Sequence, residues 1–124
     1  MKAIILSLCF SVFSATLFAQ DKQQEKIDSV CLLVKKYWAA KDADKIYSMT
    51  GDLFQQQLTQ ENFRDICTGK LFPLGEMTTT FESFTDGINK YKAVFSANTS
   101  NWSFYLSLDS QDKIKTFLFK PSAQ

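Results

Sequence analysis

The hydrophobic period of this chain changes at Gly75, and this change limits the fold more than any other feature of the sequence. Before Gly75, apolar residues recur at steps of three and four, which is the period of an amphipathic helix. After Gly75 they alternate with polar residues, which is the period of a half-buried β-strand. This order predicts an α+β domain whose helices pack on one face of an antiparallel sheet.

Three helices are predicted before Gly75. The first covers residues 22–40, and its apolar stripe consists of Ile27, Val30, Cys31, Val34, Tyr37 and Trp38. The second is short, ends at Gly51 and directs Ile46, Tyr47 and Met49 inward. The third follows Thr59, a favourable N-cap residue, and its inner face carries Phe63, Ile66 and Cys67.

Four strands are predicted after Gly75, at residues 77–84, 91–97, 102–109 and 114–119. Turn-forming residues separate them, and the short connections predict an antiparallel meander. The predicted fold is therefore three helices on one face of a four-stranded meander.

The register of each hairpin follows from keeping like faces together, because a one-residue slip turns every side chain to the other face. In the last hairpin, a three-residue loop ends at Asp112 in the left-handed conformation. The predicted pairs are Leu108 with Ile114, Leu106 with Thr116, Phe104 with Leu118 and, in the first hairpin, Phe81 with Ala93. The inner face then carries Met77, Phe81, Tyr91, Phe95, Trp102, Phe104, Leu106, Leu108, Ile114 and Leu118.

The same register places three aromatic residues on the outer face of the sheet. Tyr105 lies opposite Phe117, and Phe119 lies among serines. Exposed aromatic patches of this kind are typical of interaction surfaces. Tyr105, Phe117 and Phe119 are therefore a candidate surface for a homodimer or a secreted protein partner. The alternative is that a neighbouring segment covers them.

Residues 1–20 have the pattern of a secretory signal peptide. Lys2 precedes an uncharged apolar run from Ala3 to Ala19, and the chain then becomes polar. Cleavage near residue 20 predicts a single exported domain of residues 21–124, periplasmic or extracellular, with no stable membrane anchor. The alternative is an uncleaved anchor helix.

Composition excludes several classes of function. Without Lys2, 13 basic residues face 13 acidic ones, and no basic cluster predicts nucleic-acid binding. The chain has no histidine, which removes the common imidazole-based catalytic and zinc sites. We therefore expect no cofactor and no metal.

Two cysteines, Cys31 and Cys67, follow the predicted signal peptide. An even pair in an oxidising compartment suggests a disulfide, which requires the two helices to pack side by side. The alternative is a pair of buried free thiols, since free cysteine is a common core residue.

Three segments resemble the nuclear transport factor 2-like (cystatin-like) superfamily. "VKKYWAAKDADKIYSMTGDLF" is similar to its first two helices, and "DGINKYKAVFS" and "SFYLSLDSQDKIKTFLFKP" are similar to its central and final strands. The last segment also resembles secreted bacterial domains of unknown function that occur alone or ahead of secreted hydrolase domains. The resemblance implies a cone formed by a curved sheet wrapped around helices.

The superfamily includes isomerases, dehydratases and non-catalytic binding modules. Its ketosteroid-isomerase-like enzymes place an Asp or His base and a Tyr or Asp donor inside the cone. Tyr37, Tyr47 and Tyr91 are candidate donors here, whereas Glu82 and Asp109 fall on the predicted outer side. An inward carboxylate beside a buried tyrosine would favour an enzyme.

The inward aromatic residues form a candidate ligand pocket, since small-molecule sites are mostly apolar. They are Trp38, Tyr47, Phe54, Tyr91, Phe95, Trp102 and Phe104, and the alternative is that they fill the core. The sequence thus favours an exported, non-catalytic domain that uses its sheet for self-association, a partner or a small apolar ligand. The alternatives are a small isomerase- or dehydratase-like enzyme and a module acting on a secreted hydrolase.

Overall fold

The structure, a computed structural model, describes the backbone of residues 2–97 and 99–122 and the side chains of residues 21–97 and 99–122. The α+β prediction is confirmed: four antiparallel strands form one sheet, accompanied by several helices. The elements are α1 (Lys2–Ala39), α2 (Ala43–Ser48), α3 (Asp52–Gln57), α4 (Gln60–Ile66), a π turn η1 (Cys67–Leu71), a 3-10 turn η2 (Phe72–Leu74), β1 (Met77–Thr85), β2 (Ile88–Phe95), β3 (Asn101–Leu108) and β4 (Ile114–Pro121).

The described part of the chain contains one more α-helix than the sequence predicts, because residues 52–57 form α3. The three-helix prediction did not include α3. This helix buries no residue fully, and its sequence accordingly has no clear apolar stripe. Both neighbouring helices are capped: the Asp42 side chain accepts a hydrogen bond from Lys45 N, and the Thr59 side chain, the predicted N-cap, accepts one from Asn62 N.

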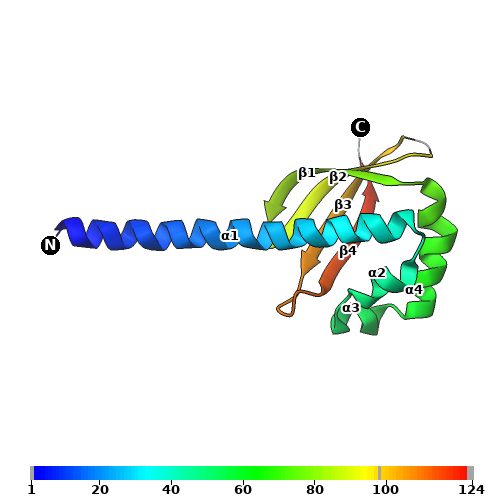
Figure 1. Ribbon diagram of the computed structural model, residues 1–124, viewed down its shortest axis with the longest axis horizontal. Coiled ribbons are helices and arrows are strands. Elements are labelled where there is room, and N and C mark those ends of the chain that lie inside the picture. Colours follow the sequence, from blue (N-terminus) through cyan, green and yellow to red (C-terminus); the bar gives the residue numbers. More distant parts are fainter. Residues whose placement is uncertain (1, 98, 123–124) are drawn as a thin grey trace.

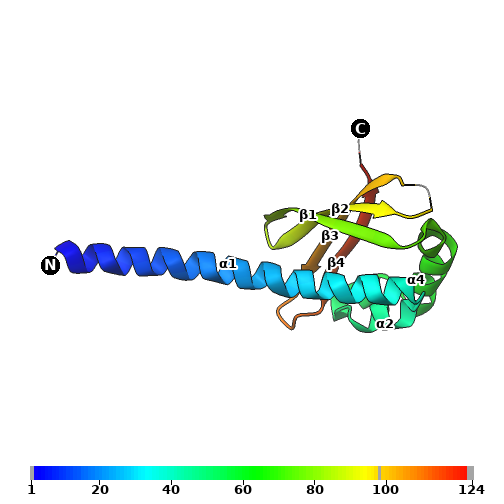
Figure 2. The ribbon, with the colours of Figure 1, turned by 45° about the horizontal axis from the view of Figure 1, so that its top comes forward.

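Helix α1 lies along one face of the sheet, and the short helices gather near its C-terminal end (Figure 1). Its N-terminal part projects beyond the sheet (Figures 1 and 2). The predicted signal peptide falls on residues 1–20, which lie outside the residues with described side chains. Among residues 21–97 and 99–122, whose side chains are described, no helix is long and apolar enough to cross a membrane.

The strands follow the predicted meander, in the order β1-β2-β3-β4. The core lies between the sheet and the helices, where Ile27, Val34 and Trp38 of α1 are buried. The Trp38 ring packs against Phe95 and Phe119, with centroids 5.5 and 5.4 Å away. Its indole N–H donates to the Gly75 carbonyl at 2.8 Å, which attaches α1 to the chain just before β1.

A β-bulge at Lys115 corrects the predicted register of the last hairpin. Leu108 pairs with Ile114 and Asp112 adopts a φ of 59°, both as predicted. Beyond that point one strand carries an extra residue, because Thr116 pairs with Ser107. The observed pairs are therefore Leu106 with Phe117 and Phe104 with Phe119, in place of Leu106 with Thr116 and Phe104 with Leu118.

The bulge changes which side chains of β4 face the helices. Phe117 and Phe119 lie on the core side, where both pack against buried residues. Leu118, which the sequence placed in the core, is instead 43% exposed. Phe117 and Phe119, which the regular register placed on the outer face of the sheet, therefore belong to its inner face.

Two features correct the first hairpin by one residue each: a two-residue turn, with Thr85 paired to Ile88, and a second bulge at Glu82. Phe81 pairs with Tyr91 and Thr79 pairs with Ala93, whereas the sequence placed Phe81 opposite Ala93. The next pair is Ser83 with Lys90, so Glu82 is the extra residue. Phe81 lies on the face toward α1, where it lines a recess with Cys31 and Leu32, but it is 39% exposed because β1 is an edge strand.

The turn between α2 and α3 is attached to the start of β4. Thr50 forms a parallel bridge with Ile114. The Ile114 amide donates to the Met49 carbonyl at 2.8 Å, and the Gly51 amide donates to the Ile114 carbonyl at 2.9 Å. A Cβ at Gly51 would meet the end of the Asp109 side chain, which would have to move aside.

Candidate functional site

An apolar groove opens between the short helices and the edge strand β4, with a cavity volume of about 250 Å³. We call it the apolar groove. All of its lining side chains are hydrocarbon: Phe54, Leu58, Phe63, Ile66, Leu71, Phe117, Leu118 and Phe119. They come from α3, the α3–α4 connection, α4, η1 and β4. Such a surface suits an uncharged apolar molecule, because it offers no side-chain partner for a charge.

Phe63 forms the floor of the groove. It is buried, and its ring centroid lies 6.0 Å from Phe54 and 5.9 Å from Phe117, both in edge-to-face contacts. Phe117 in turn contacts Phe119 edge-to-face, with centroids 5.4 Å apart. Aromatic pairs prefer this arrangement, so the walls support one another. Ile66 and Leu118 are 38% and 43% exposed and lie at the rim.

Polar contacts beneath the groove hold α3 in place. The Tyr47 hydroxyl donates to the Leu58 carbonyl at 2.8 Å, which ties α2 to the connection after α3. The Gln55 side-chain amide donates to Thr50 Oγ1 at 3.1 Å. Because α3 buries no residue fully, these bonds and the ring of Phe54 fix its position.

The residues of the predicted pocket separate into two groups. Phe54 alone among them lines the apolar groove. Trp38, Tyr47, Tyr91, Phe95 and Phe104 are buried, and Trp102 packs half-buried against them. Their rings stack closely, as in the pair Phe95 and Trp102 with centroids 6.0 Å apart. These rings serve as core.

The structure also divides the predicted partner surface. Phe117 and Phe119 line the apolar groove, whereas Tyr105 lies on the other face of β3, where Lys120 Nζ is 5.8 Å from its ring centroid. The three residues therefore do not form one patch. The reason is the bulge at Lys115, whose position the residue types in this stretch do not predict.

A second recess of about 250 Å³ lies between α1 and β1 and is lined by Asp28, Cys31, Leu32, Lys35, Thr79, Phe81 and Tyr91. The Tyr91 hydroxyl donates to Asp28 Oδ1 at 2.7 Å. Asn89 Nδ2 donates to the Tyr91 hydroxyl at 2.8 Å and to Asp28 Oδ1 at 3.1 Å. Burial raises the pKa of Tyr91 above its usual value of 10.0, so the phenol stays protonated.

Sequence reasoning missed Asp28 and Asn89. The inward carboxylate was sought among the acidic residues of the strands, and the second strand was predicted to begin at residue 91 rather than at Ile88. The available signal was alternation: Asn89, Tyr91, Ala93 and Phe95 all occupy buried positions of β2. A polar residue at an inward strand position requires hydrogen-bond partners. Asn89 Nδ2 finds them on α1 and Tyr91, whereas the buried Asn89 Oδ1 has none among the described residues.

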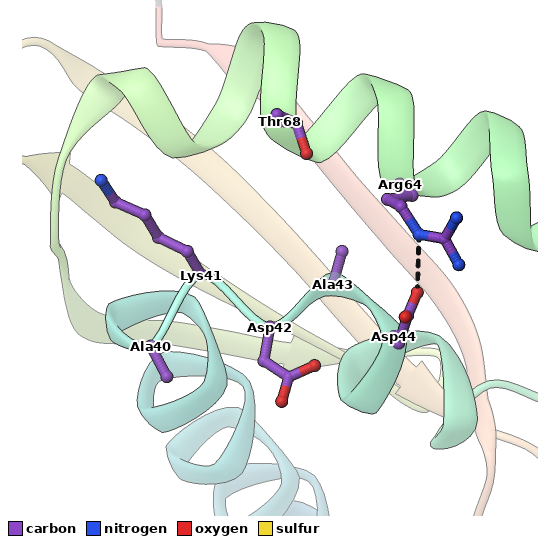
Figure 3. Close-up of a pocket in the computed structure, with 7 residues that line it drawn as sticks. All are labelled: Ala40, Lys41, Asp42, Ala43, Asp44, Arg64 and Thr68. Atoms are coloured by element: carbon purple, nitrogen blue, oxygen red, sulfur yellow. Dashed lines mark hydrogen bonds and ion pairs between the residues drawn. The ribbon is translucent and has the colours of Figure 1, made fainter.

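A third hollow, also of about 250 Å³, lies between the α1–α2 turn and α4 (Figure 3). Its lining contains two cations, Lys41 and Arg64, and two carboxylates, Asp42 and Asp44. Arg64 Nε lies 3.0 Å from Asp44 Oδ1, and Asp42 caps α2. The charges are therefore balanced and partly used for local structure, and the hollow offers no excess charge for a ligand.

Cys31 and Cys67 are free and buried, so the bridge that the sequence suggested is not formed. Cys31 faces β1, with its sulfur 3.8 Å from Thr79 Oγ1, whereas Cys67 begins η1 after α4. Burial raises the pKa of both thiols, for Cys67 to about 12, and so disfavours the reactive thiolate.

No group of three or more His, Cys, Asp or Glu side chains that could hold a metal ion occurs among the described residues. Comparisons of the chain with protein-family models, with curated proteins and with solved structures found no match.

Proposed function

We propose that this chain is an exported, non-catalytic binding domain that holds a small uncharged apolar ligand in the apolar groove. The observation that carries the proposal is the lining: eight hydrocarbon side chains around about 250 Å³. Transferring apolar surface from water into such a groove is favourable by about 25 cal/mol per Å². The groove is smaller than typical sites for drug-sized ligands, which points to a compact ligand.

The uncharged lining also indicates what the groove rejects. A carboxylate or ammonium placed in it would lose hydration without gaining a side-chain partner. We therefore expect a neutral molecule to bind more tightly than an ionised molecule of the same carbon skeleton. 1-Decanol and decanoate form such a pair.

Binding is measured with the neutral fluorophore N-phenyl-1-naphthylamine, whose emission rises and shifts to shorter wavelength in apolar surroundings. Titration into the purified protein should give saturable binding, and 1-decanol should displace the probe more effectively than decanoate. Leu118→Glu places a charge on the rim of the groove and should weaken binding at least tenfold.

Leu53→Glu is the matched control. Leu53 is 64% exposed and lies on α3, outside the groove lining. The Leu53→Glu variant should bind the probe as tightly as the unmodified protein does. Equal binding by Leu118→Glu and Leu53→Glu would overturn the proposal, and a change of mass caused only by Leu118→Glu would show that a second copy occupies the groove.

The proposal includes the nuclear transport factor 2-like relationship. Helices that precede a four-stranded antiparallel meander, with α1 along one face of the sheet, support it. A curved sheet enclosing its helices as a cone, and export after cleavage near residue 20, belong to the same proposal. N-terminal sequencing of the protein released by an expressing cell tests the export and the cleavage.

A second candidate function rests on Asp28 and Tyr91. A half-buried carboxylate that accepts a hydrogen bond from a buried tyrosine is the arrangement that would favour an isomerase- or dehydratase-like enzyme. It ranks second because the Tyr91 hydrogen is directed at Asp28 and is not available to a substrate oxygen. The test is isomerisation of a β,γ-unsaturated ketone to its conjugated form, which Asp28→Asn should abolish.

A further inference from the structure

The two edges of the sheet differ in their protection against strand pairing. β4 carries the exposed residues Lys115 and Lys120, ends at Pro121 and contains a bulge. Lysine, proline and bulges are the devices by which natural sheets block an edge. The β4 edge is therefore closed to another strand.

The β1 edge lacks most of these devices. Its sequence, MTTTFESFT, contains no lysine and no proline, and its one charged residue, Glu82, lies in the bulge. Between Met77 and Phe81 the strand is regular, and Thr78, Thr80 and Phe81 are exposed. Threonine and phenylalanine favour β-structure, so this half of β1 is a suitable template for another strand.

The main-chain groups of this segment point outward at alternate residues. The Ser96 amide donates to the Glu76 carbonyl at 2.9 Å, so Glu76 directs its main-chain groups at the neighbouring strand. In an antiparallel ladder this direction alternates along the strand. The main-chain groups of Met77, Thr79 and Phe81 consequently point away from β2.

We infer that β1 is a dimerisation edge, on which the β1 strand of a second copy pairs antiparallel about a two-fold axis at Thr79. Thr79 then faces Thr79 of the second copy, and Met77 faces Phe81 of the second copy. The outward main-chain groups of the three residues form about six hydrogen bonds across the axis. Two four-stranded sheets become one continuous sheet.

The side chains of this pairing are compatible with one another. Threonine opposite threonine is a favourable cross-strand pair, and a methionine sulfur beside an aromatic ring is attractive. Met77, Thr79 and Phe81 share the face of β1 that looks toward α1, because alternate residues of a strand point the same way. The helices of both copies then cover the same face of the continuous sheet.

Apolar residues beside the edge also favour the dimer. Leu32, on α1, is 65% exposed and lines the same recess as Phe81, which is 39% exposed. Pairing would cover Phe81 and reduce the exposure of Leu32. The apolar groove lies beside β4 at the other edge of the sheet, so it stays open in the dimer and this inference is independent of the groove's ligand.

One feature opposes the pairing. Glu76 of one copy approaches Glu82 of the other near each end of the paired segment. Glu82 is partly compensated, because Lys90 Nζ lies 3.5 Å from its carboxylate. Glu76→Gln removes the repulsion and should strengthen association, which a contact elsewhere on the molecule would not predict.

Light scattering and sedimentation equilibrium of the purified protein over a range of concentrations test the inference. The unmodified protein should dimerise, and Thr79→Pro should weaken dimerisation at least tenfold because it removes an outward N–H from each copy. Phe81→Lys should do the same by placing a charge on the edge. Thr79→Val keeps the N–H and is the matched control.

Circular dichroism must show that each variant remains folded. If Thr79→Pro does not fold, Phe81→Lys takes its place in the comparison with Thr79→Val. The inference is wrong if the unmodified protein is monomeric at its highest soluble concentration. It is also wrong if Phe81→Lys dimerises as strongly as Thr79→Val, or if Glu76→Gln leaves association unchanged.

Discussion

Phe104 and Phe119 stack face to face across β3 and β4, with ring centroids 4.4 Å apart and ring planes within 4° of parallel. The contact exists because the bulge at Lys115 brings Phe119 opposite Phe104. A regular ladder from Ile114 onward would have placed Leu118 there. One unpaired residue thus moves two phenylalanines into the wall of the apolar groove.

The bulge makes β4 respond differently to deletion and insertion. Deleting Lys115 should leave Ile114, Phe117 and Phe119 facing inward, because it converts the bulge into a regular ladder. Inserting alanine after Thr116 should turn Phe117 and Phe119 outward and cost about 3 kcal/mol or more, as for loss of buried phenylalanine. Urea unfolding measures the free energy of unfolding of both variants. Equal destabilisation by the deletion and the insertion would contradict the assigned register.

The contact between Asp28 and Tyr91 should be measurable as a coupling energy. Tyr91→Phe removes a hydrogen bond to a charged group and should lower the free energy of unfolding by about 1–3 kcal/mol. In a double-mutant cycle with Asp28→Asn, the two effects should be non-additive by about 0.5–3 kcal/mol. Tyr105→Phe, at a half-buried position on the other face, is the control and should change stability little.

The same tyrosine predicts a loss of stability at high pH. Its pKa is raised in the folded protein by burial, so above pH 10 the unfolded phenol ionises while the folded one does not. The stabilisation from the protonated form is complete below about pH 10 and is lost as the pH rises further. Tyr91→Phe should therefore show a shallower decline in stability above pH 10.

Burial of both thiols predicts their chemical behaviour. With Cys9 replaced by serine, the native protein should react slowly with Ellman's reagent, because Cys31 and Cys67 are buried and their pKa values are raised. Both should react once the protein is unfolded in urea. A denatured protein with no reactive thiol would instead indicate the disulfide.

Periodicity located the four strands, with the second starting at Ile88 rather than at residue 91, because apolar and polar residues alternate along them and turn residues stand at their ends. It also placed Asp112 correctly at the turn, where a left-handed residue is required. It could not locate the bulges at Glu82 and Lys115, because an extra residue in a strand has no composition of its own. The groove depends on one of these bulges, and so only Phe54 of the predicted pocket belongs to it.

The short bridge at Thr50 links the unfolding of the helices to that of the sheet. Met49 and Gly51 exchange main-chain hydrogen bonds with Ile114, the first residue of β4. Neither the α2–α3 turn nor the start of β4 can open without breaking those bonds. The amide hydrogens of Gly51 and Ile114 should therefore exchange with solvent at one shared rate, as members of a single cooperative unit that joins the two halves of the sequence.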